Sequence, residues 1–200
     1  MQVAELISSP AIAPRTGSAV VLTPVRAEHH EFLYQLATDE TDGLRWRYAG
    51  MVPRRDTFDQ TIWNGILAQF IVVDRESHAP IGVVSAYNAD VNHGYAYVMA
   101  AMVSGVTKSG IGVEAVDLFF GHLFECYRLR VLYLEVPEYN VPQFASAVGW
   151  FLKEEGRLLE HTFYGGRFWD RLIFALHRED YSSELAVQRF GRRRRQRPTR

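Results

Sequence analysis

The sequence predicts a mixed α/β fold, in which one sheet of about seven strands carries helices on both faces. Two observations lead to this prediction. Between Tyr95 and Gly156, a strand-like run, an amphipathic helix, a second strand-like run and a second helix follow one another. That order produces a pair of parallel strands joined by a crossover. Paired apolar runs on either side of this unit indicate antiparallel hairpins at the ends of the same sheet.

Length and composition suit a single domain with a substantial core. The chain has 200 residues, of which 48% are hydrophobic and 13% aromatic. No apolar run reaches the ~18 residues of a membrane span, and the N-terminus lacks the pattern of a signal peptide. The single cysteine, Cys126, excludes an internal disulfide and favours a cytoplasmic setting. We expect a flexible leader at 1–18, the domain at 19–181 and a disordered tail at 182–200.

The charge is unevenly distributed, since the last ten residues, GRRRRQRPTR, contain six arginines. Such a run suits contact with nucleic acid, acidic lipid or an acidic partner such as a carrier protein. The rest of the chain is acidic, which argues against a nucleic-acid enzyme. A solvated tail with no dedicated partner is the preferred interpretation.

The first half of the chain predicts two helices and the start of the sheet. Helices are expected over Glu28–Ala37 and Thr57–Gln69, the second because Phe58, Ile62 and Ile66 recur at four-residue spacing. The polar and aromatic segment Thr38–Asp56 is expected to be a long connection between them. Runs rich in β-branched and aromatic residues predict strands over Ala19–Val25, Phe70–Val73, Ile81–Tyr87 and Tyr95–Val103.

A glycine-containing loop, Thr107–Ala115, then leads into the clearest helix. Val116, Phe119, Phe120, Leu123 and Phe124 fall on one helical face, opposite charged residues. A glycine loop that opens a helix can hold a phosphate, because the first N–H groups are unbonded and glycine lets the backbone approach closely. The alternative, a tight strand-to-helix turn without a ligand, is equally favoured on these residues alone.

The last third predicts a strand, a helix and a hairpin. Val131–Val136 is an apolar strand. Asn140 can cap a helix that has Pro142 in its first turn and ends at Gly156. The glycine pair Gly165-Gly166 indicates a tight turn between strands, expected over Arg157–Tyr164 and Phe168–His177.

With these elements in order, the chain resembles the GNAT superfamily of acyl-CoA-dependent N-acetyltransferases over about Val20 to Tyr181. The stretch from Thr107 to Gly112 lies where the family has Arg/Gln-x-x-Gly-x-Gly/Ala. Glu114-Ala115, Asn140, Glu155-Gly156 and Gly166-Arg167-Phe168-Trp169-Asp170 match patterns of the RimJ/RimL group. The resemblance implies a centrally splayed sheet and acyl transfer from acetyl-CoA or another acyl-CoA to an amine, without a metal.

The resemblance also implies a set of residues that bind the acyl-CoA. Backbone groups of the loop would hold the pyrophosphate, the end of the preceding strand would pair with the pantetheine arm, and Asn140 would cap its helix and touch that arm. The set comprises Ala101, Met102, Val103, Thr107, Lys108, Ser109, Gly110, Ile111, Gly112, Val113, Asn140 and Phe144. The sequence departs from the family at Thr107, which replaces Arg/Gln, and at Ala147, where many members have a tyrosine that protonates the leaving thiolate.

The catalytic groups are less sharply indicated. Glu135, Tyr97, Tyr139 and His93 lie near strand ends expected to face the centre, so each is a candidate general base. Each also has a structural reading: Tyr97 as core, His93 as a turn residue and Glu135 as a paired strand-end charge. Gln143 does not titrate but can donate a hydrogen bond to the thiolate. No histidine spacing suggests a metal site.

Three functions remain open: an N-acyltransferase, a GNAT-fold protein that binds acyl-CoA without catalysis, and a nucleic-acid-binding protein that uses the arginine tail. In the first, the acceptor is an amine-bearing small molecule or a peptide N-terminus. The donor is an acyl-CoA or the thioester of an acidic carrier protein, and a homodimer is a possible assembly.

Overall fold

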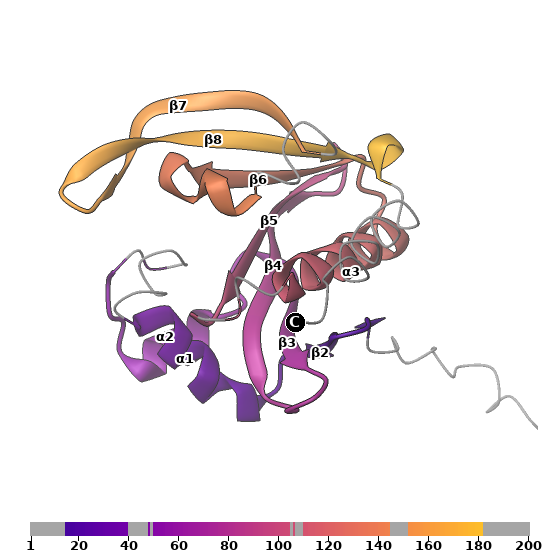
Figure 1. Cartoon of the computed structure of the whole chain (residues 1–200), viewed down its shortest axis with the longest axis vertical. Helices are drawn as coiled ribbons and strands as arrows, with labels where there is room; N and C mark the ends of the chain where they lie inside the picture. The colour runs from indigo at the N-terminus through magenta and orange to yellow at the C-terminus, as the bar shows by residue number, and fades with distance from the viewer. Residues whose placement is uncertain are drawn as a thin grey trace, which may run out of the picture.

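A computed structural model describes residues 15–39, 48, 50–104, 106, 110–144 and 152–181, without the side chains of Gln143 and Phe144. These residues form one mixed sheet with helices against it (Figure 1). In chain order the elements are β1 (Arg15–Thr16), β2 (Val20–Pro24), η1 (Ala27–His29), α1 (His30–Thr38), α2 (Arg55–Thr61), β3 (Ile66–Asp74), β4 (Pro80–Asp90), β5 (Tyr95–Met102), α3 (Ile111–Cys126), β6 (Val131–Pro137), η3 (Glu138–Phe144), β7 (Lys153–Tyr164), β8 (Arg167–His177) and η4 (Arg178–Asp180).

The sheet has eight described strands in the order β1-β2-β3-β4-β5-β6-β8-β7. All neighbouring strands are antiparallel except β5 and β6, which run parallel. The parallel pairing covers three residue pairs, from Tyr95↔Val131 to Tyr97↔Tyr133. Beyond them the two halves of the sheet separate, as Figure 1 shows. The predicted mixed, splayed sheet is confirmed.

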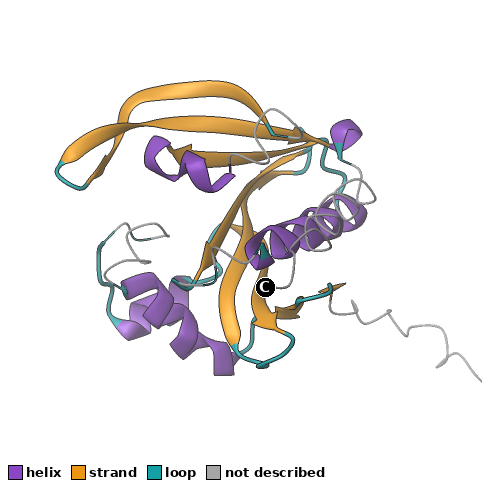
Figure 2. Cartoon of the chain, viewed as in Figure 1, coloured by secondary structure: helices purple, strands orange, loops and turns teal. Residues whose placement is uncertain are grey.

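The helices cover opposite faces of the sheet (Figure 2). On one face, α3 buries Phe119, Phe120 and Leu123 against alternate residues of the central strands. On the other, α1 and α2 bury Leu33, Phe58 and neighbours against the remaining face of β3 and β4. Because side chains of a strand alternate between faces, each central strand contributes to both layers. This explains the nearly continuous apolar runs of β3 and β4.

Several predicted elements agree closely with the structure. The helix after the glycine loop is α3, and the expected hairpin is β7–β8. Both glycines of its turn have positive φ, 60° at Gly165 and 81° at Gly166, as a two-residue type I′ hairpin turn requires. A strand is also present at each of the other predicted strand positions, with ends that differ by up to four residues.

The predicted helix Thr57–Gln69 is wrong in its second half. Helix α2 ends at Thr61, and β3 begins at Ile66. Gly65 turns the chain between them with a φ of 71°, which favours glycine. From Ala68 onward the side chains alternate across the sheet rather than following one helical face. The four-residue spacing of Ile62 and Ile66 therefore joins two different elements.

The predicted helix from Asn140 to Gly156 is also wrong at its end. The described part is a 3₁₀ helix, η3, and Gly156 lies within β7, paired with Ile173. Residues 145–151, which include Ala147, lie outside the described residues. Arg15 and Thr16, in the segment expected to be a leader, pair with β2 as strand β1. In the described part of the chain, no helix is long and apolar enough to cross a membrane.

Candidate functional site

The separation of β5 from β6 creates the most distinctive feature of the sheet. After Tyr97, β5 continues for five residues paired with β4, up to Gly82↔Met102. Meanwhile β6 continues to Pro137 paired with β8. No described strand therefore pairs with β5 on its β6 side from Val98 to Met102. Such an edge offers backbone hydrogen-bonding groups to an extended ligand.

Helix α3 begins beside the end of β5. Gly110 precedes the helix with a left-handed backbone, φ 77° and ψ −3°, and a side-chain carbon at this position would meet no atom within 4 Å. The 16-residue helix leaves the N–H groups of Gly112 and Val113 without intrahelical acceptors. A carbon added at Gly112 would lie 3.7 Å from the Met102 side chain, so the first turn of α3 lies against the end of β5.

The structure thus brings the predicted cofactor-binding residues of β5 and α3 together. Ala101 and Met102 end β5, Val103 follows, and Ile111, Gly112 and Val113 form the first turn of α3. Thr107, Lys108 and Ser109 lie outside the described residues, so their predicted role receives no geometry. The side chains of Phe144 and Gln143 are likewise not described.

Asn140 differs from its prediction. It lies inside η3, and its Oδ1 atom is buried with no hydrogen-bond partner among the described residues, so its side chain caps no described helix. A buried carbonyl oxygen without a donor is costly. An N–H group from a bound ligand would satisfy this oxygen.

A cluster of tyrosines lies where β4, β5 and β6 meet. The rings of Tyr97 and Tyr133 are 5.6 Å apart, those of Tyr87 and Tyr97 5.8 Å, and those of Tyr95 and Tyr133 6.1 Å. Tyr87, Tyr97 and Tyr133 occupy one register row. By strand alternation they share the sheet face of Met99, which packs against the cluster of α1 and α2. We call Tyr87, Tyr95, Tyr97 and Tyr133 the tyrosine cluster.

One carboxylate, that of Glu135, lies beside this cluster. Glu135 is two residues beyond Tyr133 on β6, and Arg171 Nη1 on β8 donates to its Oε2 at 3.1 Å. Burial, with a contribution from the nearby Glu135 charge, raises the pKa of Tyr87 to about 12. The same two causes raise the pKa of Tyr97. Both phenols therefore stay protonated at neutral pH, which makes Tyr97 a poor general base.

Tyr139 and His93 lie elsewhere. Tyr139 stacks on Tyr164, with ring centres 4.5 Å apart, and meets the edge of Trp169 at 5.4 Å. It thus packs against the tip of the β7–β8 hairpin. His93 lies in the turn before β5, 2.8 Å from Asp90. Among the described residues, no group of three or more histidine, cysteine or acidic side chains is placed to hold a metal.

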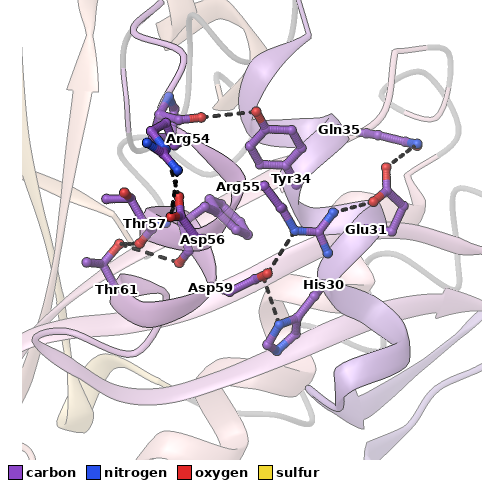
Figure 3. Close-up of polar contacts among 12 residues, drawn as sticks. His30, Glu31, Tyr34, Gln35, Arg54, Arg55, Asp56, Thr57, Asp59 and Thr61 are labelled. Atoms are coloured by element: carbon purple, nitrogen blue, oxygen red, sulfur yellow. Dashed lines mark hydrogen bonds and ion pairs between the residues drawn. The ribbon is translucent and has the colours of Figure 1, made fainter.

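Helices α1 and α2, which cover this face, are joined by the polar network in Figure 3. Arg55 donates to Glu31 on α1 and to Asp59 on α2, the latter at 2.9 Å. His30 lies 3.0 Å from the other Asp59 oxygen, and Gln35 donates to Glu31 at 2.8 Å. Glu31 and Asp59 are therefore already paired within the protein.

Sequence reasoning missed Tyr87, Tyr133 and Arg171. All three lie on strands that were recognised, and Tyr133 and Glu135 share a face through their two-residue spacing. The sequence alone does not reveal the order of the strands in the sheet. Arg171, which lies 36 residues after Glu135, contacts it only because β8 pairs with β6.

No family model and no curated protein matches the sequence. Among solved structures, a spermidine N-acetyltransferase from Vibrio cholerae, in complex with CoA and spermine, is 20% identical with a TM-score of 0.71, and the match covers 82% of this chain and 99% of that one. A GCN5-related N-acetyltransferase from Brucella melitensis is 21% identical with a TM-score of 0.67, covering 87% and 83%. A GNAT-family acetyltransferase from Bacillus anthracis is 14% identical with a TM-score of 0.64, covering 82% and 98%. This chain therefore has the GNAT fold.

Proposed function

We propose that the protein is an N-acyltransferase that transfers an acyl group, in the first instance acetyl, from CoA to an amine. The observation that carries this proposal is the opening between β5 and β6 with the N-terminus of α3 at its end. A structure similar in fold is a spermidine N-acetyltransferase in complex with CoA.

Three features of the chain fit an acyl-CoA. The first turn of α3, behind Gly110, offers backbone N–H groups and a helix dipole to the pyrophosphate. The β5 edge at Ala101, Met102 and Val103 suits the amides of the pantetheine arm. The orphaned Oδ1 of Asn140 would accept one of the N–H groups of that arm. Thr107, Lys108 and Ser109 complete the proposed loop.

In the proposed reaction the neutral amine attacks the thioester carbonyl carbon. A C–N bond forms, the C–S bond breaks, the amine loses a proton and the CoA thiolate gains one. The products are an amide and free CoA thiol. Holding the two reactants in line supplies much of the acceleration, and a backbone N–H at the opening between the strands would stabilise the oxyanion.

Glu135 is the proposed group that orients the amine and accepts its proton, directly or through water. Its Oε2 receives a hydrogen bond from Arg171, which fixes the carboxylate beside Tyr97. Tyr97, with its raised pKa, is better suited to donating a hydrogen bond than to removing a proton. Tyr139 and Gln143 remain proposals, the latter as a hydrogen-bond donor to the thiolate.

We place the chain in the RimJ/RimL-like group of the fold on its motifs. Asp170, the last residue of the motif from Gly166, accepts the Glu160 N–H at 2.9 Å and pairs with Arg157 at 3.0 Å. Asp170 thereby fixes β7 at Glu160, which has a positive φ of 47°. The further proposals are a cytoplasmic location, a homodimer, and an arginine tail that is not part of the active site. A similar structure, that of a spermidine N-acetyltransferase from Vibrio cholerae, is dodecameric.

Binding of CoA tests the placement of the pyrophosphate. Gly110→Val forces a β-branched residue into a left-handed backbone, whereas Gly110→Asn keeps that conformation available. By calorimetry, we expect Gly110→Val to weaken CoA binding at least about tenfold and Gly110→Asn to change it much less. Equal affinity for the wild type and Gly110→Val would contradict the proposal.

Release of free thiol from acetyl-CoA tests the chemistry itself. With a panel of amines, the wild type should release thiol only when an acceptor is present, and deletion of residues 191–200 should leave turnover unchanged. CoA binding without thiol release for any acceptor would instead favour a non-catalytic acyl-CoA-binding protein. Turnover only with an acyl carrier protein, and its loss on deletion of the tail, would identify the carrier thioester as donor.

A further inference from the structure

Resting on the proposed function, we infer that the acceptor is a small molecule with one primary amine attached to an aromatic or similarly flat apolar body. The juxtaposition that points to this class is the tyrosine cluster beside the carboxylate of Glu135, which is paired with Arg171.

The tyrosine cluster supplies ring surface at the point where the strands separate. Tyr97 contacts three other members, with ring centres 5.6 to 6.2 Å apart. Tyr97 and Tyr133 end the paired part of β5 and β6, so they border the opening where the thioester would lie. Ring faces attract both flat apolar groups and an ammonium group.

Rings continue along the same face of β8 and β7. Trp169 lies two residues before Arg171 on β8, and therefore on the same face. Its indole nitrogen donates to the carbonyl oxygen of Tyr164 at 2.9 Å, and the Arg167 guanidinium lies 3.4 Å from its ring centre. The body of an acceptor whose amine lies near Glu135 would thus meet the tyrosine cluster on one side of the Glu135–Arg171 pair and the Trp169–Arg167 stack on the other.

The pairing of the acidic side chains argues against an acceptor with several ammonium groups. Glu135 is paired with Arg171, so the pair has no net charge. On α1 and α2, Glu31 and Asp59 are held by Arg55, and Asp56 pairs with Arg54 (Figure 3). In the described part of the chain, each of these carboxylates already shares its charge with an arginine, so a second ammonium group would gain less from it than from an unpaired carboxylate.

The test compares three acceptors with the full-length protein and saturating acetyl-CoA. These are 2-phenylethylamine, n-butylamine, which has the amine without the ring, and spermidine, which has several amines without a ring. From thiol release we expect kcat/KM for 2-phenylethylamine to exceed both others by about tenfold or more. Equal or better use of spermidine would overturn the inference.

Two variants separate ring recognition from a general loss of structure. Tyr133→Leu should raise KM for 2-phenylethylamine about fivefold or more while changing kcat little, and should leave KM for n-butylamine nearly unchanged. Phe163→Leu, at an exposed ring on the hairpin, should change neither. An equal loss with both amines in Tyr133→Leu would overturn the inference. No thiol release with any amine would overturn the proposed function instead, so the two failures are distinguishable.

Discussion

Glu114, in the first turn of α3, accepts the backbone N–H of Ala19 at 3.0 Å and also that of Ser18. A side chain of the helix that follows the glycine loop therefore fixes the start of β2, 95 residues earlier in the chain. Charged acceptors make the stronger hydrogen bonds in proteins. We expect Glu114→Ala to lower the free energy of unfolding by about 1–3 kcal/mol, measured by urea denaturation.

Glu125 supplies the matched control for that variant. It lies on the same helix and pairs with Arg15 of β1, but its side chain is 65% exposed. An exposed ion pair contributes little, so Glu125→Ala should cost less than about 1 kcal/mol. Equal losses of unfolding free energy in the two variants would mean that the hydrogen bonds from the backbone to Glu114 stabilise the protein no more than an exposed ion pair does.

Arg178 closes the other end of α3. Its guanidinium donates to the carbonyl oxygens of Leu129, Phe124 and Tyr127 at 2.6 to 2.7 Å. These include acceptors that the end of the helix leaves unsatisfied. Arg178→Lys keeps the charge but loses the planar fork, so we expect a loss of about 1–3 kcal/mol in unfolding free energy. Arg128→Lys, at an exposed position nearby, should show almost none.

Asp117 gives the stability a pH dependence of known sign. Burial, opposed by a hydrogen bond from Tyr181 and aided by the charge of Glu114, raises the pKa of Asp117 from 3.8 to about 6. The folded state thus binds the proton more tightly than the unfolded chain. The resulting stabilisation is complete below pH 3.8 and is lost as the pH rises through 6.

Asp117→Asn should remove this dependence while keeping an acceptor for Tyr181. When the pH is raised from 5 to 8, the wild type should lose this stabilisation and the variant should not. The Tm of the variant minus that of the wild type should therefore be larger at pH 8 than at pH 5. Thermal unfolding of both proteins at the two pH values measures the difference. The same Tm difference between the two proteins at both pH values would show that Asp117 does not titrate between pH 5 and 8.

The parts of the fold that were predicted correctly are those governed by local rules. The face of α3 from Val116 to Phe124 repeats every three or four residues, and Gly165-Gly166 permits the positive φ values that a two-residue hairpin turn needs. The errors occurred where two elements share one apolar spacing, as at Ile62 and Ile66. At Asn140 the predicted cap is absent and the described helix is the short η3, with Pro142 inside it.

Local sequence rules also explain why only part of the candidate site was predicted. The sequence places Glu135 and Tyr97 near the ends of recognisable strands, which made them candidates. Their partners do not, because Tyr87 lies opposite Tyr97 and Arg171 reaches Glu135 only through sheet register. Register between distant strands is set by packing of whole faces, which a single sequence does not display.

Gln69 and Ser85 form a polar pair in an otherwise apolar layer. Both are almost fully buried, at 3% and 2% exposure, and Ser85 Oγ donates to Gln69 Oε1 at 2.8 Å. The Gln69 Nε2 atom has no hydrogen-bond partner in the described part of the chain. Rotating the amide would exchange its two ends without satisfying both, because Ser85 meets one end alone. The native pair therefore already carries one unsatisfied group.

This arrangement predicts a non-additive pair of substitutions. Ser85→Ala leaves the whole amide unpaired and should cost about 1–3 kcal/mol in unfolding free energy. Gln69→Met together with Ser85→Ala removes both polar groups at similar volume, so the double variant should be more stable than Ser85→Ala alone. Urea denaturation of the two single variants and the double variant measures the coupling. A double variant no more stable than Ser85→Ala would show that the buried amide does not lower the stability of the single variant.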